Sequence, residues 1–313
     1  KRYNAQRLEA REALKQPQPN LAIRFVAGFS ADTSVIDVVR VCVRLEAFDA
    51  AEMLAAGKVG GAIGSLEQML ALAQCLASAK HLDARLHAAY LRAEAMAVMQ
   101  AIVMHEKATR EDLKALLRIV QVQLQNWTDD AAAWIGERAI GLHTYELVRE
   151  GALLILLTEQ EIDEFQREGD LRALALSARR NADRDQLYYL ETMRQVIESC
   201  QRPPHSRLPL FESIQQELQQ RRGSPDFPFV AGRLLLTQLA AAHAIQSRDR
   251  ANWEAWALAL ATATGQNLPQ QVNPLTGKPF EVAREDSLIV VSGIVPGPGA
   301  DRIRVYVPDL SKS

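Results

Sequence analysis

The chain has 313 residues, of which 48% are hydrophobic and 24% charged, and its formal net charge is −2 at pH 7. This composition is that of a globular protein with length for one or two hydrophobic cores. It excludes an acidic disordered chain, and it also excludes a polybasic nucleic-acid-binding protein, which would carry an excess of Lys and Arg.

The prolines divide the chain into two parts. All 13 lie at positions 17 and 19 or from position 203 onward. Because proline removes a backbone donor and clashes inside a helix, the proline-free stretch predicts one helix after another. We therefore expect a helical body over 1–200, with an N-terminal helix and connector over 1–33. A second part over 201–313 is expected to hold helices followed by a small β-sheet module packed on the body.

Apolar residues recur at spacings of three and four within the proline-free stretch, as in Leu66, Met69 and Leu70. This periodicity is typical of amphipathic helices. Pairs three residues apart, Thr109 with Asp112 and Thr158 with Glu161, predict capping boxes at two helix starts. After an N-terminal helix that ends before Pro17, we expect helices at about 34–56, 63–79, 83–106, 110–125, 130–150, 159–167, 170–200, 209–222, 228–248 and 251–264.

The pattern changes after Leu268, where Pro and Gly separate short runs rich in β-branched residues. These runs predict strands at 280–283, 288–291 and 303–307. The fold class predicted is therefore mainly α: a multi-helix bundle or irregular α-array with a small C-terminal antiparallel β-meander. We expect the meander to pack on a helix, because an isolated hairpin is marginal in water.

No segment of the sequence predicts a membrane span, since its apolar runs, such as 152–157, are far short of the roughly 20 residues required. The chain begins with Lys rather than Met, so we expect it to be processed or trimmed, with room for a signal or anchor ahead of it. Cys42, Cys75 and Cys200 lack metal-binding spacing and are predicted to be small buried residues. A disulfide between Cys42 and Cys75 stays open as an alternative.

The sequence lacks the common catalytic and cofactor motifs. The glycines of 57–64 follow a predicted helix and lack the order of a phosphate-binding loop, so they predict an interhelical turn. No zincin or helical di-iron spacing and no nucleophile elbow occurs. We accordingly predict no cofactor, no metal and no catalytic residue, and we lean towards a protein that is not an enzyme.

Six residues are candidates for binding. Glu137 and Arg138 are charged neighbours inside the apolar stretch 131–140, where they predict an interhelical ion-pair network or a polar groove. His143 and Glu146 lie one turn apart on the same predicted helix, and we group all four on one face. Asn273 and Lys278 belong to a tight turn over 273–280 that introduces the first strand.

Aromatic and basic pairs elsewhere are interpreted as structural. Trp253 with Trp256 and Trp127 with Trp134 are expected to be packing residues, as is the pair Tyr188–Tyr189. The basic pairs 179–180 and 221–222 are expected to lie on solvated faces.

Three segments carry a family resemblance. Residues 47–79, residues 136–139, and residues 231–265 followed by 273–280 resemble a family of uncharacterised planctomycete envelope proteins, over about two thirds of the chain. The turn at 273–280 is also similar to the start of the C-terminal sheet in type II secretion pseudopilins. The resemblance implies an N-terminal membrane anchor and a large helical extracytoplasmic region, and it carries over no catalytic residue. The chain departs from the pattern with Asn273 where Asp is usual, and its 294–299 segment lacks the acidic ending that would support a calcium site.

From these observations we expect a non-enzymatic interaction or scaffold protein on the periplasmic side of a bacterial cell envelope. Grooves between its helices would bind a protein or peptide partner. Two alternatives remain: an enzyme with a polar interhelical cleft acting on an envelope substrate, and a secretion or pilus-like assembly component.

Overall fold

The computed structural model describes residues 4–15, 28, 31–168, 171–224, 227–268, 271–294 and 302–307. It confirms the predicted fold class, a mainly helical protein with a small C-terminal antiparallel sheet. The helices are α1 (Asn4–Leu14), α2 (Ser34–Ala55), α3 (Val59–Ser78), α4 (Leu82–Val103), α5 (Arg110–Gln125), α6 (Asp130–Arg149), α7 (Glu159–Glu168), α8 (Leu171–Ser199), α9 (Leu208–Arg221) and α10 (Leu239–Thr264). Short turns of other helix types are η2 (Leu153–Leu156), η3 (Pro204–Ser206) and the π-helical η4 (Ala231–Leu235).

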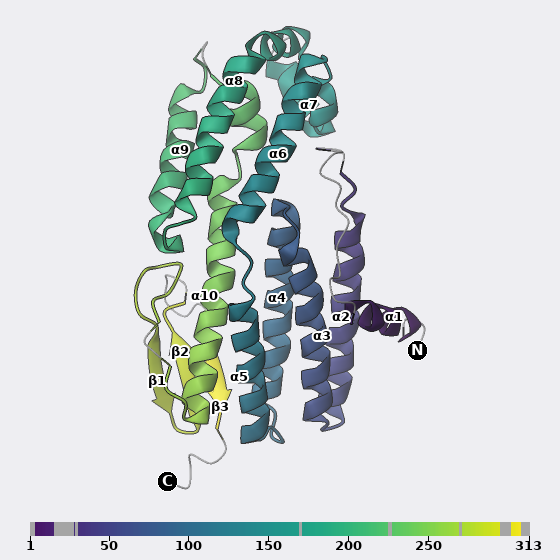
Figure 1. Cartoon of the computed structure of the whole chain (residues 1–313), viewed down its shortest axis with the longest axis vertical. Coiled ribbons are helices and arrows are strands. Elements are labelled where there is room, and N and C mark those ends of the chain that lie inside the picture. The colour runs from purple at the N-terminus through teal and green to yellow at the C-terminus, as the bar shows by residue number, and fades with distance from the viewer. Residues whose placement is uncertain are drawn as a thin grey trace.

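The helices form two bundles stacked end to end along α10, which belongs to both (Figure 1). The lower bundle contains α2, α3, α4, α5 and the second half of α10, and its core includes the sheet. The upper bundle contains α6, α8, α9, η4 and the first half of α10. At 26 residues, α10 is about 39 Å long; its start belongs to the upper core and its second half to the lower core. The predicted boundary at residue 200 is not the division between these cores, because α6 and α8 pack with the later helices.

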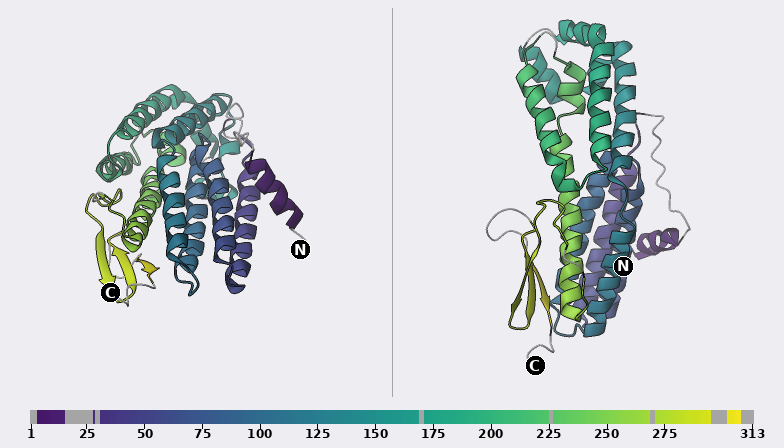
Figure 2. Two further views of the ribbon diagram at one scale, coloured as in Figure 1. Left: turned by 60° about the horizontal axis from the view of Figure 1, so that its bottom comes forward. Right: turned by 60° about the vertical axis from the view of Figure 1, so that its left-hand side comes forward.

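The sheet covers one side of the lower half of α10 (Figure 2). Strands β1 (Glu281–Glu285), β2 (Leu288–Ser292) and β3 (Ile303–Tyr306) pair antiparallel in the order β1-β2-β3. Ile289, Val291 and Val305 belong to the lower core, whereas every residue of β1 is exposed. The meander therefore adds apolar surface to α10 and leaves its first strand at the edge.

A polar layer lies where the two cores meet. The Arg92 side chain is fully buried, and its Nη1 donates to Asp249 Oδ2 of α10 at 2.9 Å. Asp130, at the start of α6, accepts from Arg85 Nη2 at 3.3 Å and from Arg207 Nη1 at 2.7 Å. These pairs join α4, α6 and α10, so the contact between the bundles includes buried charge as well as apolar packing.

Trp127, in the connector between α5 and α6, lies beneath the guanidinium groups of this layer. The guanidinium carbons of Arg85, Arg92 and Arg250 are 5.2, 4.8 and 5.0 Å from the centroid of its ring. Contacts of this kind are attractive because a cation meets the negative face of the ring. The ring therefore offsets part of the repulsion between the three arginines.

The structure confirms the predicted capping boxes but changes the bounds of several predicted helices. Capping boxes are present at Thr109 and at Thr158, as predicted. The break expected between 248 and 251 is wrong, and the helix expected over 228–248 is confirmed only from Leu239 onward. A π-helical turn ends before α10 begins at Leu239, and α10 then continues unbroken because no Gly or Pro interrupts its interior. Helix α3 begins at Val59, four residues earlier than expected, so Gly60 and Gly61 are helical.

Cysteine and tryptophan burial was also predicted. The three cysteines are free thiols; Cys75 is buried, whereas Cys42 and Cys200 are only half-buried. Trp134, Trp253 and Trp256 lie in the cores, in agreement with a packing role. Among the described helices, none has the length and apolar character that crossing a membrane requires.

Candidate functional site

The four candidates on α6 do not share one face. Glu137 and Glu146 are nine residues apart, about two and a half helical turns, so their side chains point in opposite directions. Glu146 is exposed, while Glu137, Arg138 and His143 are half-buried. A Cβ atom on Gly28 would lie 2.2 Å from the His143 ring, so the imidazole packs against that glycine.

The ion-pair network predicted for Glu137 and Arg138 is wrong. Among the described residues, neither side chain forms a salt bridge or a side-chain hydrogen bond. The backbone of this segment is used instead: Tyr189 Oη of α8 donates to the Glu137 carbonyl at 3.0 Å. Tyr189 approaches closely because residue 141 is glycine, where a Cβ atom would lie 2.2 Å from Oη. These residues therefore serve mainly to pack α6 on α8.

The Glu137 carboxyl group titrates near neutral pH. Burial raises its pKa to about 7, and the nearby negative charge of Asp83 adds to the effect. The folded protein thus keeps a proton on Glu137 between pH 4.5 and 7, where an unfolded chain releases it. Folding stability is lost as pH rises through this window, because the folded state then has to hold a poorly solvated charge.

Replacement of this carboxyl should remove that pH dependence. We expect Glu137→Gln to be more stable than the wild type by about 2 kcal/mol at pH 8 and nearly equal to it at pH 4.5, allowing for partial exposure. Urea unfolding at the two pH values measures the difference. Glu146→Gln, an exposed change on the same helix, should leave stability within about 0.5 kcal/mol at both. An equal effect of Glu137→Gln at pH 4.5 and 8 would contradict the assignment.

The two candidates in the 273–280 turn, Asn273 and Lys278, differ in how deeply they are buried. Asn273 is fully buried, and its Nδ2 donates to the carbonyls of Gly293 at 2.7 Å and Ile294 at 2.9 Å. Its Oδ1 accepts from Leu275 N at 2.8 Å. Because the amide is fully used inside the protein, Asn273 holds the turn against the end of β2 and is not available to a ligand. Lys278 is exposed.

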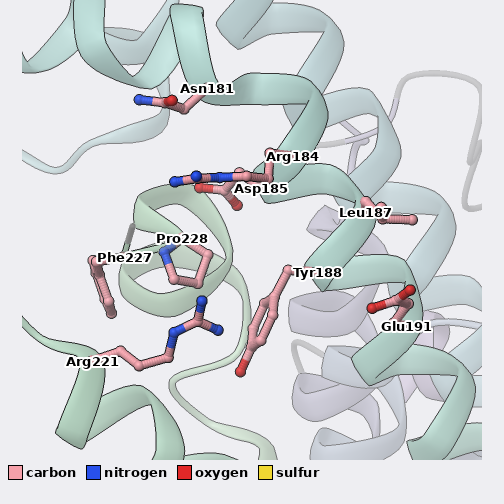
Figure 3. A pocket seen from close by; sticks show the side chains of 9 residues that line it. All are labelled: Asn181, Arg184, Asp185, Leu187, Tyr188, Glu191, Arg221, Phe227 and Pro228. Atoms are coloured by element: carbon pink, nitrogen blue, oxygen red, sulfur yellow. The ribbon is translucent and has the colours of Figure 1, made fainter. Parts of the chain in front are cut away.

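A pocket lined by both polar and apolar side chains lies in the upper bundle, between α8, α9 and the Phe227–Pro228 segment (Figure 3). Because Arg184 and Arg221 are part of its lining, we call it the arginine pocket. Its volume is about 260 Å³. Helix α8 provides most of the lining, Arg221 extends from the end of α9, and Phe227 with Pro228 closes one side. The residues that line it are Asn181, Arg184, Asp185, Leu187, Tyr188, Glu191, Arg221, Phe227 and Pro228.

Two guanidinium groups reach the pocket from different helices. Figure 3 shows the Arg184 and Arg221 side chains on either side of Pro228, with the Tyr188 ring beside Arg221. The Arg221 guanidinium carbon is 5.2 Å from the Tyr188 ring centroid, and Arg221 Nη1 donates to Glu217 at 3.1 Å. The contact with the Tyr188 ring and the hydrogen bond to Glu217 both orient the Arg221 guanidinium group. Its remaining N–H groups keep the geometry that binds a carboxylate or phosphate.

The apolar side of the pocket is held in place by buried contacts. Asp185 is buried and accepts from the backbone N–H groups of Val230 at 2.8 Å and Ala231 at 2.9 Å, which ties the segment after Pro228 to α8. Tyr145 Oη of α6 donates to the same carboxylate at 2.6 Å. Burial raises the pKa of Asp185, and these three hydrogen bonds oppose the shift. The pocket wall is therefore anchored at one carboxylate.

The sequence analysis does not predict this pocket. Tyr188–Tyr189 and Arg221–Arg222 appear there as two unremarkable pairs, 33 positions apart. Helical phase separates the members of the first pair: Tyr189 is buried against α6, whereas Tyr188 faces the pocket. No spacing in the sequence indicates that Arg184 and Arg221 converge, because only the packing of α9 on α8 brings them together.

Within the described part of the chain, no group of three or more His, Cys, Asp or Glu side chains could hold a metal ion. No family model, no curated protein and no solved structure matches the chain.

Proposed function

We propose that this is a non-enzymatic interaction protein of a bacterial cell envelope, and that it binds an acidic segment of a partner protein in the pocket between α8 and α9. The observation that carries the proposal is the convergence of Arg184 and Arg221 on one cavity beside Tyr188. The envelope location is supported by the resemblance of residues 47–79, 231–265 and 273–280, and cell fractionation tests it.

The chemistry of the pocket favours binding over catalysis. Guanidinium groups remain protonated in proteins, so Arg184 and Arg221 can hold an anion but cannot exchange protons with a substrate near neutral pH. Pockets for drug-sized ligands and cofactors usually measure about 300–1,000 Å³, and this one is smaller. A carboxylate side chain with its neighbouring apolar residue fits this space better than a cofactor does.

The lining also suggests how a peptide would lie. Arg184 and Arg221 would bind the carboxylate, while Phe227, Leu187 and the Tyr188 ring would contact an adjacent apolar residue. Glu191, exposed on α8, offers an acceptor for a peptide N–H group. We therefore expect preference for a sequence in which Glu or Asp alternates with an apolar residue.

Binding of a labelled peptide tests the proposal. A fluorescein-labelled peptide of about eight residues, alternating Glu with Leu, should bind more tightly than its Gln–Leu counterpart in fluorescence anisotropy. The double variant Arg184→Gln/Arg221→Gln should weaken binding of the Glu–Leu peptide by about tenfold or more, since hydrogen bonds to charged groups are worth about 1.5–3 kcal/mol each.

A matched control uses exposed arginines beside the pocket. Arg180→Gln/Arg222→Gln removes the same total charge but leaves the pocket lining intact. It should change affinity less than threefold, through long-range electrostatics alone. Equal loss of affinity in the two double variants, or equal binding of the Glu–Leu and Gln–Leu peptides, would overturn the proposal.

A further inference from the structure

A second concave surface lies in the lower bundle, away from the arginine pocket. It is a groove of about 380 Å³ between α3 and α5. The residues that line it are Glu67, Leu70 and Ala71 from α3, and Ala115, Arg118, Ile119, Val122 and Gln123 from α5. We propose that this groove binds an amphipathic helix of a partner protein, with basic residues along one edge of the helix and acidic residues along the other.

The shape of the groove suits a helix. Helices α3 and α5 run in the same direction because each is joined to α4 by a short turn (Figure 1). Ala71 and Ala115 are small residues on opposite walls, so they leave room for a larger side chain to enter between them. On α5, Ala115, Ile119 and Val122 form a stripe at helical spacing, and Val122 is 48% exposed. Such a surface binds the apolar stripe of another helix.

The charges on the two walls of the groove specify which charge each edge of the partner helix should carry. Glu67 is exposed on the α3 wall and Arg118 is exposed on the α5 wall. Among the described residues neither side chain has an ion-pair partner. A helix lying between them meets a negative charge on one side and a positive charge on the other. One basic and one acidic edge therefore complement the groove, and like charges facing Glu67 or Arg118 would oppose binding.

A buried polar atom in the groove also lacks a partner. Gln123 is only 9% exposed, and its Oε1 has no hydrogen bond within the described structure. A buried acceptor left unsatisfied is costly, and rotation of the Gln123 amide towards an amide donor on a bound helix would remove the cost. This acceptor specifies the ligand further: a Gln or Asn within the apolar stripe.

A second copy of the chain is a poorer occupant than a separate helix. Two copies meeting at this surface would bring two concave grooves together and leave a void between them, and voids forfeit packing contacts. A convex helix fills the groove. This proposal is independent of the one for the arginine pocket, since the two surfaces lie in different bundles and are tested with different peptides and variants.

Charge matching provides the test. Three labelled helical peptides of about 18 residues share a Leu stripe with a central Gln and differ only in their edges. One has a Lys edge and a Glu edge, the second has two Lys edges and the third has two Glu edges. Circular dichroism confirms equal helicity, and fluorescence anisotropy measures affinity. The wild-type protein should prefer the mixed peptide by about fivefold, because each of the other two peptides replaces one ion pair with a like-charge repulsion of similar size.

Reversal of either wall should change the preference. Glu67→Lys makes both walls positive, so the peptide with two Glu edges should bind best. Arg118→Glu makes both walls negative and should favour the peptide with two Lys edges. Glu106→Lys, an exposed reversal beyond the end of α4, should keep the preference of the wild type. This design does not depend on the direction in which the peptide lies, because reversing a peptide only exchanges its edges.

Three results would overturn the proposal. These are absence of binding by all three peptides, a preference unchanged by both wall reversals, and dimerisation of the protein in sedimentation that the same reversals abolish. The last result would assign the groove to a second copy of the chain.

Discussion

Asp249→Ala should destabilise the protein by about 3–5 kcal/mol, a large part of the stability of a typical domain. The reason is the charge that remains. Arg92 is fully buried, and without Asp249 the one hydrogen bond that its guanidinium keeps among the described residues runs from Nη2 to Gln74 Oε1, at 2.9 Å. Burial raises the pKa of Asp249, whereas the charge of Arg92 opposes that shift and so favours the ionised form of Asp249. Urea unfolding measures the loss.

A double variant separates the ion pair from packing. Arg92→Met combined with Asp249→Leu removes both charges and retains apolar volume, so it should recover at least half of the stability lost in Asp249→Ala. Glu198→Ala provides the surface comparison, because Glu198 and Arg194 form an exposed pair at 3.8 Å, and it should cost less than about 0.5 kcal/mol. A double variant no more stable than Asp249→Ala would show that the buried charge is not the cause.

Asp185→Ala should have the second largest effect, about 3 kcal/mol or more. It leaves three donors without their acceptor at one buried point: the N–H groups of Val230 and Ala231, and the hydroxyl of Tyr145. Each unsatisfied buried donor costs about 1–3 kcal/mol. Because this carboxylate ties the start of η4 to α8, its loss should also loosen the wall of the arginine pocket.

Two comparisons test this explanation. Tyr145→Phe removes only one of the three donors, so it should cost about 1 kcal/mol. Asp183→Ala, on the same helix, changes a side chain that is 92% exposed and should cost less than about 0.5 kcal/mol. Hydrogen exchange should show faster exchange of the Val230 and Ala231 amides in Asp185→Ala. Unchanged protection of these amides, or a stability equal to that of Tyr145→Phe, would contradict the role given to Asp185.

The scaffold function that we propose would use both the arginine pocket and the groove. The pocket lies in the upper bundle and the groove in the lower one, so two partners could bind at once. Helix α10 contributes residues to both cores, and the Arg92–Asp249 pair lies where these cores meet. The bundles are thereby joined by a buried contact that Asp249→Ala is designed to break.

Local structure was predicted where local chemistry decides it. The absence of proline from 20–202 and the capping boxes at Thr109 and Thr158 are properties of short segments, and the structure bears out the helices and caps that they predict. The error at 248–251 has a tertiary cause. Arg248, Asp249 and Arg250 resemble a polar break between two helices in the sequence, but in the fold this segment of α10 crosses the polar layer between the bundles.

By itself, the sequence determined the helical class, most of the helix ends and the closing meander, because periodicity, capping and proline act over one or two turns. Only the tertiary structure decided which polar side chains meet. Helical phase placed Glu137 and Glu146 on opposite sides of α6, and the packing of α9 on α8 brought Arg221 towards Arg184 across 37 positions of sequence. Contacts between distant segments depend on how whole helices pack, and no short stretch of sequence carries that information.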